Sequence, residues 1–170
     1  MMASNVSMHE ALTLAIAPAS DHPRGLDLEG LISYLSEHTG VSINLHRCES
    51  YSEAMTALAD GTAQIGWLGS YAFKEMSAGS DSIEAFAVGV PKGKLSPNYN
   101  TLFIVRPDSK IRVLSDVRHS SIALGDIYST SGYDVPKREL ADIGIELETE
   151  GFFKTIRRVS THDEAIRAVL

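Results

Sequence analysis

The first seventy residues alternate between strand-like and helix-like patterns, and this alternation constrains the fold more than any other feature. Apolar runs at 12–17, 41–45 and 64–68 are typical of strands, and we expect Trp67 in the core. Between the first two, after a loop at 21–25, apolar residues recur every three or four positions from Leu28 to Leu35, in a helix that Gly40 ends. Between the second and third, the capping box Ser50-Tyr-Ser-Glu53 opens another helix. Strands alternating with helices form right-handed βαβ units, so we predict a parallel sheet.

The second half of the sequence continues the α/β pattern. We expect strands at 83–90, 100–105, 121–125 and within 152–159, a helical turn at 115–118, and helices from 131 to 140 and from Thr161 onward. The Pro- and Gly-rich segment 91–98 marks a domain boundary. We therefore predict a first lobe at 1–92, with residues 1–10 disordered, and a second lobe at 93–170. The sequence stops at Leu170 within a helical pattern, so we expect the second lobe to be incomplete, and to be completed by further chain or by another molecule.

Composition narrows the classes of function. Apolar residues make up 44% of the chain and charged residues 22%, which is ordinary for a globular protein. A net charge of -7 argues against nucleic acid or an anionic membrane as a partner, because both require basic patches. We expect no membrane span, and the N-terminus has no export signal, so the chain is either cytoplasmic or has lost a signal. Cys48 is the single cysteine, which excludes an internal disulfide and a cysteine-based metal site. The histidines, His46 among them, show no spacing typical of metal ligands, so we predict no metal site and no cofactor.

The segment Gly125-Asp-Ile-Tyr-Ser129-Thr130-Ser131-Gly132 is the strongest candidate for a ligand site. It joins an expected strand to an expected helix, and a helix start offers free backbone N–H groups and partial positive charge. Three consecutive hydroxyl side chains add donors, and Gly132 allows a close approach to the backbone. These features predict a cradle for a small oxyanion. The alternative is a helix cap without a ligand, since Ser and Thr are common caps.

Three further residues are candidate ligand contacts. Tyr51 and Tyr71 follow expected strands at the carboxyl edge of the sheet, where each phenol either meets a ligand or closes the core. His162 begins the last helix, either as a solvated residue or as a donor to an anion.

Signatures of catalysis are missing from the sequence. The segment from Gly125 to Gly132 does not match a P-loop, no G-x-S-x-G elbow occurs, and no pair of carboxylates has a spacing that indicates acid–base chemistry. We therefore predict a binding protein and not an enzyme.

Several segments together resemble a known family. They are Glu49-Ser-Tyr51, the run from Asp60 to Tyr71 (DGTAQIGWLGSY), the run from Phe103 to Ser109 (FIVRPDS), Leu124 to Tyr133 followed by Pro136, and Phe153 through His162 to Leu170. In this combination they resemble the phosphate, phosphite and phosphonate solute-binding proteins of ABC transporters, over residues 12–170.

This resemblance implies a type II periplasmic-binding-protein fold, with two lobes of parallel or mixed sheet flanked by helices that close on the ligand. It implies that Ser129, Thr130 and Ser131 bind phosphonate oxygens at the helix start. It also implies that Tyr51 and Tyr71 contact the ligand from the facing lobe and that His162 is a further donor.

The family further implies an ABC permease as partner and an extracytoplasmic location. The chain ends where the family continues with acidic residues for the amino group of an aminoalkylphosphonate, so the identity of the oxyanion is left open. Incomplete burial predicts self-association that completes the second lobe. The alternative function is a ligand-sensing or interaction domain, or a truncated remnant, of the same fold.

Overall fold

The structure, a computed structural model, describes residues 11–18, 27–78, 82–90 and 92–170. The expected disorder of residues 1–10 and the loop expected at 21–25 lie outside these residues. In chain order the elements are β1 (Ala11–Ile16), α1 (Leu28–Thr39), β2 (Ser42–Arg47), α2 (Tyr51–Ala59), β3 (Ile65–Trp67), α3 (Ser70–Ser77), the 3-10 turn η1 (Leu114–Val117), β4 (Ser121–Leu124), the π-helical turn η2 (Thr130–Asp134), α4 (Val135–Asp142), β5 (Thr155–Arg158) and α5 (His162–Val169).

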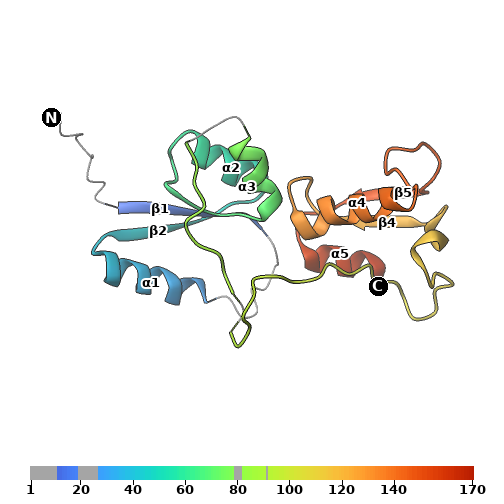
Figure 1. Ribbon diagram of the computed structural model, residues 1–170, viewed down its shortest axis with the longest axis horizontal. Helices are drawn as coiled ribbons and strands as arrows, with labels where there is room; N and C mark the ends of the chain where they lie inside the picture. The colour runs from blue at the N-terminus through green and yellow to red at the C-terminus, as the bar shows by residue number, and fades with distance from the viewer. Residues whose placement is uncertain (1–10, 19–26, 79–81, 91) are drawn as a thin grey trace.

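These elements form two α/β lobes (Figure 1). The first has a parallel sheet of order β2-β1-β3, with α1 on one face and α2 and α3 on the other. The second has the parallel pair β4-β5 between α4 and α5. The predicted α/β class with parallel sheets is therefore confirmed, whereas the boundary between 92 and 93 stays a prediction.

Local chemistry explains where the helices begin and end. The Asp27 carboxylate accepts from the backbone N–H of Gly30 at 2.8 Å and caps α1, which ends at Gly40 with a φ of 69°. The hydroxyl half of both expected capping boxes forms. The N–H of Glu53 donates to Ser50 Oγ at 3.1 Å in α2, and the N–H of Glu164 donates to Thr161 Oγ1 at 3.2 Å in α5. Each glutamate carboxylate accepts in return from the residue before the cap, and not from the cap itself.

Each lobe has its own small core. In the first lobe small side chains let α2 and α3 pack closely on the sheet, and the buried residues include Ala15, Ala54, Ala57, Ala63 and Ala72. In the second lobe larger apolar residues surround β4, namely Leu124, Leu140, Ile145, Leu147 and Phe153. Burial in these two clusters fixes the strand ends that carry the candidate site.

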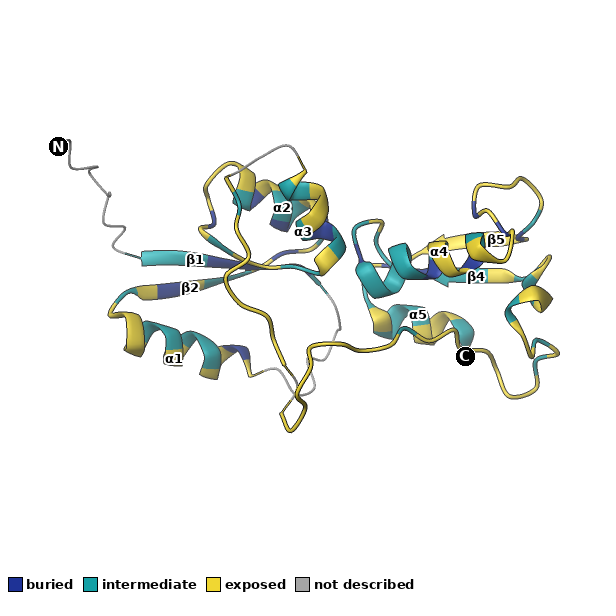
Figure 2. Cartoon of the chain, in the orientation of Figure 1, coloured by how far each residue is buried: buried dark blue, intermediate teal, exposed yellow. Residues whose placement is uncertain are grey.

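Two expected strands are absent. Residues 83–90 and 100–105 run as extended chain without a strand assignment, and Figure 2 shows most of this connecting segment exposed. Phe86 and Leu102 are both 79% exposed. These segments have strong β-propensity, but a strand also needs a hydrogen-bonding neighbour, and no such neighbour lies along them within the described residues.

Two other features differ from the expectation. Helix α3 was not predicted, because 69–71 was interpreted only as the end of a strand. Trp67, expected in the core, is 38% exposed at the end of β3, where its ring would meet a side chain placed at Gly89. Within the part of the chain that the structure describes, no helix has the length and apolar character needed to cross a bilayer.

Candidate oxyanion site

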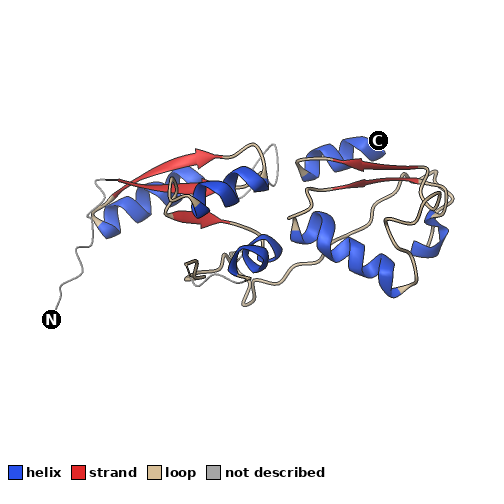
Figure 3. Ribbon diagram, turned by 90° about the horizontal axis from the view of Figure 1, so that it is seen from above, coloured by secondary structure: helices blue, strands red, loops and turns tan. Residues whose placement is uncertain are grey.

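Four helical segments begin just beyond the carboxyl ends of parallel strands. Helix α2 follows β2, α3 follows β3, the η2–α4 segment follows β4, and α5 follows β5. The carboxyl edges of the two sheets face each other across the middle of the molecule (Figure 3). Ligands of open α/β sheets bind at this edge, and each helix start brings N–H groups and partial positive charge to it. The candidate residues expected from the sequence all lie at these helix starts.

Thr130 joins the starts of two helices from different lobes. Helix α3 begins after Gly69, which provides no side-chain cap. Its missing cap comes instead from Thr130, whose Oγ1 accepts the N–H of Tyr71 at 2.9 Å and lies 3.3 Å from Ser70 Oγ. A Cβ at Gly69 would lie 2.9 Å from this oxygen, so the glycine makes the approach possible. The two helix starts therefore converge on one hydroxyl group.

Ser129 is both a helix cap and a contact of Tyr51. Its Oγ accepts the N–H of Gly132 at 3.1 Å, which is the capping alternative weighed from the sequence. The residue is only 5% exposed, and Tyr51 is 7% exposed. Burial raises the pKa of the Tyr51 phenol, and a hydrogen bond to Ser129 opposes that rise. Tyr51 thus belongs to the core and reaches the hydroxyl loop, so the two sequence-based interpretations of this tyrosine are compatible.

The loop owes its shape to two glycines. The N–H of Gly125 donates to the carbonyl oxygen of Gly132 at 2.8 Å. A Cβ on Gly132 would lie 2.8 Å from Ser129 Oγ and 3.2 Å from the Gly125 Cα. Gly132 was expected to give a ligand access to the backbone, but its lack of a side chain also lets the loop fold back on the end of β4. The helix then opens with a π turn, in which the carbonyl oxygen of Ser129 accepts from the N–H groups of both Tyr133 and Asp134.

Ser131, Gly132 and His162 share a second environment. They line a cavity of about 630 Å³, together with Gly125 and Thr101. Thr101 donates its hydroxyl to the Ser131 carbonyl oxygen at 2.7 Å and so holds the loop. Most of the cavity wall is apolar and comes from β4, α5 and residues 99–105. Only its few polar residues are suited to an oxyanion.

Sequence reasoning missed Thr101. It lies within a run that was interpreted as a strand, and only the tertiary contact shows that it supports the loop. A hydroxyl beside the Pro- and Gly-rich linker was the sole available signal.

Neutral donors dominate the electrostatics of the loop. Arg138 is paired with Asp134 on the same helix, and the Arg158 guanidinium lies 4.1 Å from the ring centroid of Tyr133. Desolvation raises the pKa of the Tyr71 phenol, and the nearby charges of Glu75 and Asp134 add to the rise. The phenol therefore stays protonated and able to donate at neutral pH. An anion here would be held mainly by hydroxyl groups, N–H groups and helix dipoles.

Comparisons with known proteins agree with this architecture. A sequence model of a family described as "ABC transporter, phosphonate, periplasmic substrate-binding protein" matches residues 14–170. One similar solved structure is a binding protein component of an ABC phosphonate transporter from Pseudomonas aeruginosa, with a TM-score of 0.71 at 21% identity over 94% of this chain and 53% of that one. Another is PhnD1 from Prochlorococcus marinus in complex with methylphosphonate, with a TM-score of 0.67 at 17% identity over 94% of this chain and 60% of that one.

The chain thus spans a little more than half the length of these relatives. At such identities the structures show the shared fold, which is the expected periplasmic-binding-protein-like architecture. The match to the family model shows the family of the chain, and it agrees with the prediction of a binding protein that is not an enzyme. The chain belongs to the phosphonate-binding family of periplasmic substrate-binding proteins of ABC transporters.

Proposed function

We propose that the chain binds a small phosphorus oxyanion, which is a phosphonate, phosphite or phosphate, as part of a solute-binding component for ABC import. The observation that carries the proposal is the Thr130 contact, in which a hydroxyl oxygen of one lobe accepts the N–H of Tyr71 at the start of α3 in the other, where Gly69 provides no cap. An oxyanion oxygen is a stronger acceptor for that N–H than a hydroxyl is. The ligand of the PhnD1 relative, methylphosphonate, has the same chemistry.

Binding is proposed to exchange one acceptor for another. An oxygen of the anion takes the N–H of Tyr71, and Thr130 turns its hydroxyl to donate to the same anion. Ser129 and Ser131 donate from the η2 start. The Tyr51 phenol and the His162 ring complete the donor set from α2 and α5.

Because the donor groups carry no net charge, they suit a ligand that has one or two negative charges and several oxygen atoms. Each charge-assisted hydrogen bond contributes about 1.5–3 kcal/mol. Four or five such bonds offset the repulsion that arises from the net charge of -7.

A thermal-shift series tests this function directly. At a ligand concentration of about one hundred times Kd the folded state gains about 2.7 kcal/mol, which raises the Tm of a chain of this size by about 5–11 °C. The series contains phosphate, phosphite, methylphosphonate and 2-aminoethylphosphonate, with chloride at equal ionic strength as the control. A folded protein whose Tm stays flat with all four anions would refute the proposal.

Transport also implies a permease partner and an extracytoplasmic location, both of which we propose from the family. Export of the full-length gene product, followed by fractionation of periplasm and cytoplasm, tests the location. Retention of the product in the cytoplasm would instead favour the alternative, a ligand-sensing or interaction domain of the same fold.

Self-association is a further part of the proposal. The apolar residues Phe86, Val88, Leu102 and Phe103 are 41–79% exposed and lie on the two extended segments without strand pairing. Exposed apolar edges of this kind favour pairing with a second copy that covers them. Sedimentation velocity should show a dimer whose fraction rises with concentration, and a monomer at all concentrations would rule out this association.

A further inference from the structure

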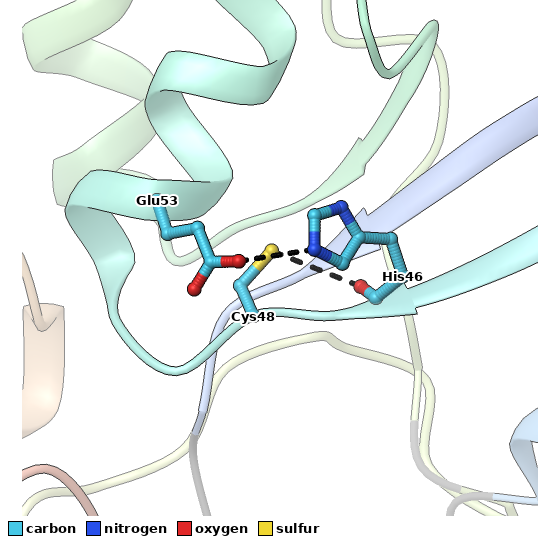
Figure 4. A group of neighbouring side chains, drawn as sticks. All are labelled: His46, Cys48 and Glu53. Atoms are coloured by element: carbon cyan, nitrogen blue, oxygen red, sulfur yellow. Dashed lines mark hydrogen bonds and ion pairs between the residues drawn. The ribbon is translucent and has the colours of Figure 1, made fainter.

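Three residues that could bind a metal ion lie close together at the start of α2, and each offers a different type of ligand atom. They are His46 near the end of β2, Cys48 just beyond it, and Glu53 in the first turn of α2 (Figure 4). One ligand atom from each residue lies within 4.8 Å of the other two. The sequence predicted no metal site, because a single cysteine and the spacing of the histidines gave no known ligand pattern. A mixed site of three different residue types has no such pattern.

Local structure explains the convergence. His46 and Cys48 are two residues apart in extended chain, so their side chains project to the same side. The Glu53 carboxylate is held at the start of α2, where its Oε2 accepts the N–H of Glu49 at 2.7 Å. Its other oxygen, Oε1, then lies 3.0 Å from His46 Nε2. The carboxylate is therefore already oriented by a hydrogen bond that a metal would leave intact.

We propose that His46, Cys48 and Glu53 form a three-ligand site for a zinc-like divalent transition metal, with a water molecule as the fourth ligand. Imidazole nitrogen, thiolate and carboxylate are the ligands that Zn²⁺ takes in proteins. Bond lengths of about 2.0–2.3 Å in a tetrahedron place ligand atoms about 3.3–3.7 Å apart. The ligand atoms of the three side chains therefore need to shift by only a few tenths of an ångström to about an ångström to bind one ion. One thiolate and one carboxylate neutralise the two charges of the ion.

The exposure of the three side chains is compatible with such a site. The side chains of His46 and Glu53 are 42% and 40% exposed, which gives an ion a route from solvent, whereas Cys48 is buried at 6%. Metal binding displaces the thiol proton to solvent and replaces the His46–Glu53 hydrogen bond with two bonds to the ion. The competing state is this hydrogen bond alone, without any metal affinity.

Co²⁺ titration of the folded protein distinguishes the two states. Co²⁺ in a tetrahedral site with a thiolate produces a thiolate charge-transfer band and intense visible bands. We expect these bands to saturate at one ion per chain and to disappear when Zn²⁺ is added. Circular dichroism before and after each titration verifies that the protein stays folded, because unfolded chains also bind metals through Cys and His.

Variants assign the ligands. Cys48→Ser should abolish the charge-transfer band, and His46→Ala and Glu53→Gln should each weaken Co²⁺ binding by at least about tenfold. Gln retains the capping box, and Glu164→Gln is the matched control, because Glu164 has the same place in the capping box of α5. The control should bind Co²⁺ like the unmodified protein.

Two results would overturn the proposal. One is the absence of the charge-transfer band in the folded protein. The other is a band that Glu53→Gln and His46→Ala leave unchanged, which would show a thiol that binds the ion without the other two ligands. The site does not depend on the oxyanion function, since none of its three residues belongs to the hydroxyl cradle.

Discussion

Replacement of Thr130 by valine removes one oxygen and almost nothing else, so it isolates the contact between the lobes. The lost bond is the 2.9 Å acceptor for the N–H of Tyr71, with the 3.3 Å contact to Ser70 Oγ. A neutral hydrogen bond of this kind contributes about 0.5–1.5 kcal/mol. Because it joins the lobes, we expect the ratio of open to closed molecules to rise about two- to tenfold without ligand.

The same substitution also removes a donor from the proposed anion site. A hydrogen bond to a charged group contributes about 1.5–3 kcal/mol, which corresponds to a 10- to 150-fold weaker affinity for the best anion of the thermal-shift series. Isothermal titration calorimetry measures this loss, and small-angle X-ray scattering measures the separation of the lobes as a radius of gyration. Thr130→Ser keeps the oxygen and should retain most of both properties.

The control is Thr155→Val, the same chemical change at an exposed position on β5. It should alter neither affinity nor radius of gyration. If Thr130→Val behaves like this control in both assays, the hydroxyl neither links the lobes nor binds the anion. The Thr130 contact would then no longer support the proposed function.

Further substitutions test other parts of the loop. Ser131→Ala should weaken anion binding by about 1–3 kcal/mol in calorimetry, whereas Ser115→Ala on the exposed η1 turn should leave it unchanged. Gly132→Ala should lower the Tm and the affinity together, because its Cβ would lie 2.8 Å from the capping oxygen and 3.2 Å from Gly125; unchanged values would mean that the loop relaxes freely. Tyr51 has a raised pKa, so its contribution to stability is complete below the ordinary phenol value of 10.0 and is lost as pH rises through the folded-state value. Tyr51→Phe should therefore flatten the alkaline fall in the free energy of unfolding, and an unaltered fall would assign it to other groups.

The sequence predicted the elements whose signals are local. Capping boxes at Ser50 and Thr161, and the glycine stop at Gly40, act within a few residues of the helix ends that they define, and the structure has those ends. The parallel sheet of the first lobe was predictable for a related reason, because strands that alternate with helices form right-handed βαβ units.

Non-local features were not predictable in this way. Residues 83–90 and 100–105 have the composition of strands, but pairing depends on a neighbour that composition does not reveal. Helix α3 was missed because Gly69 does not cap it; Thr130 does, from 60 positions along the chain. The burial of Trp67 was overestimated because aromatic residues are usually buried, whereas the end of β3 lies at an open rim.

The candidate site shows the same division. The sequence predicted which residues lie at the helix starts, since strand, turn and hydroxyl residues follow one another directly. It did not predict that Thr130 would already have an acceptor role toward Tyr71, or that Thr101 would hold the carbonyl of Ser131. Whether the seven predicted residues bind a ligand remains a prediction that the titrations above decide.

The π turn at the start of the η2–α4 segment has a consequence for the evolution of the loop. A π turn contains one residue more than an α turn, so an in-frame deletion within Thr130–Asp134 would convert the segment into regular α-helix. Each residue before the deletion would then rotate by about 100° around the helix axis, and the Thr130 hydroxyl would no longer meet the start of α3. We expect an exchange of Ser for Thr here to cost less than a change in the length of the turn. Insertions and deletions should therefore be rarer in this turn than substitutions are.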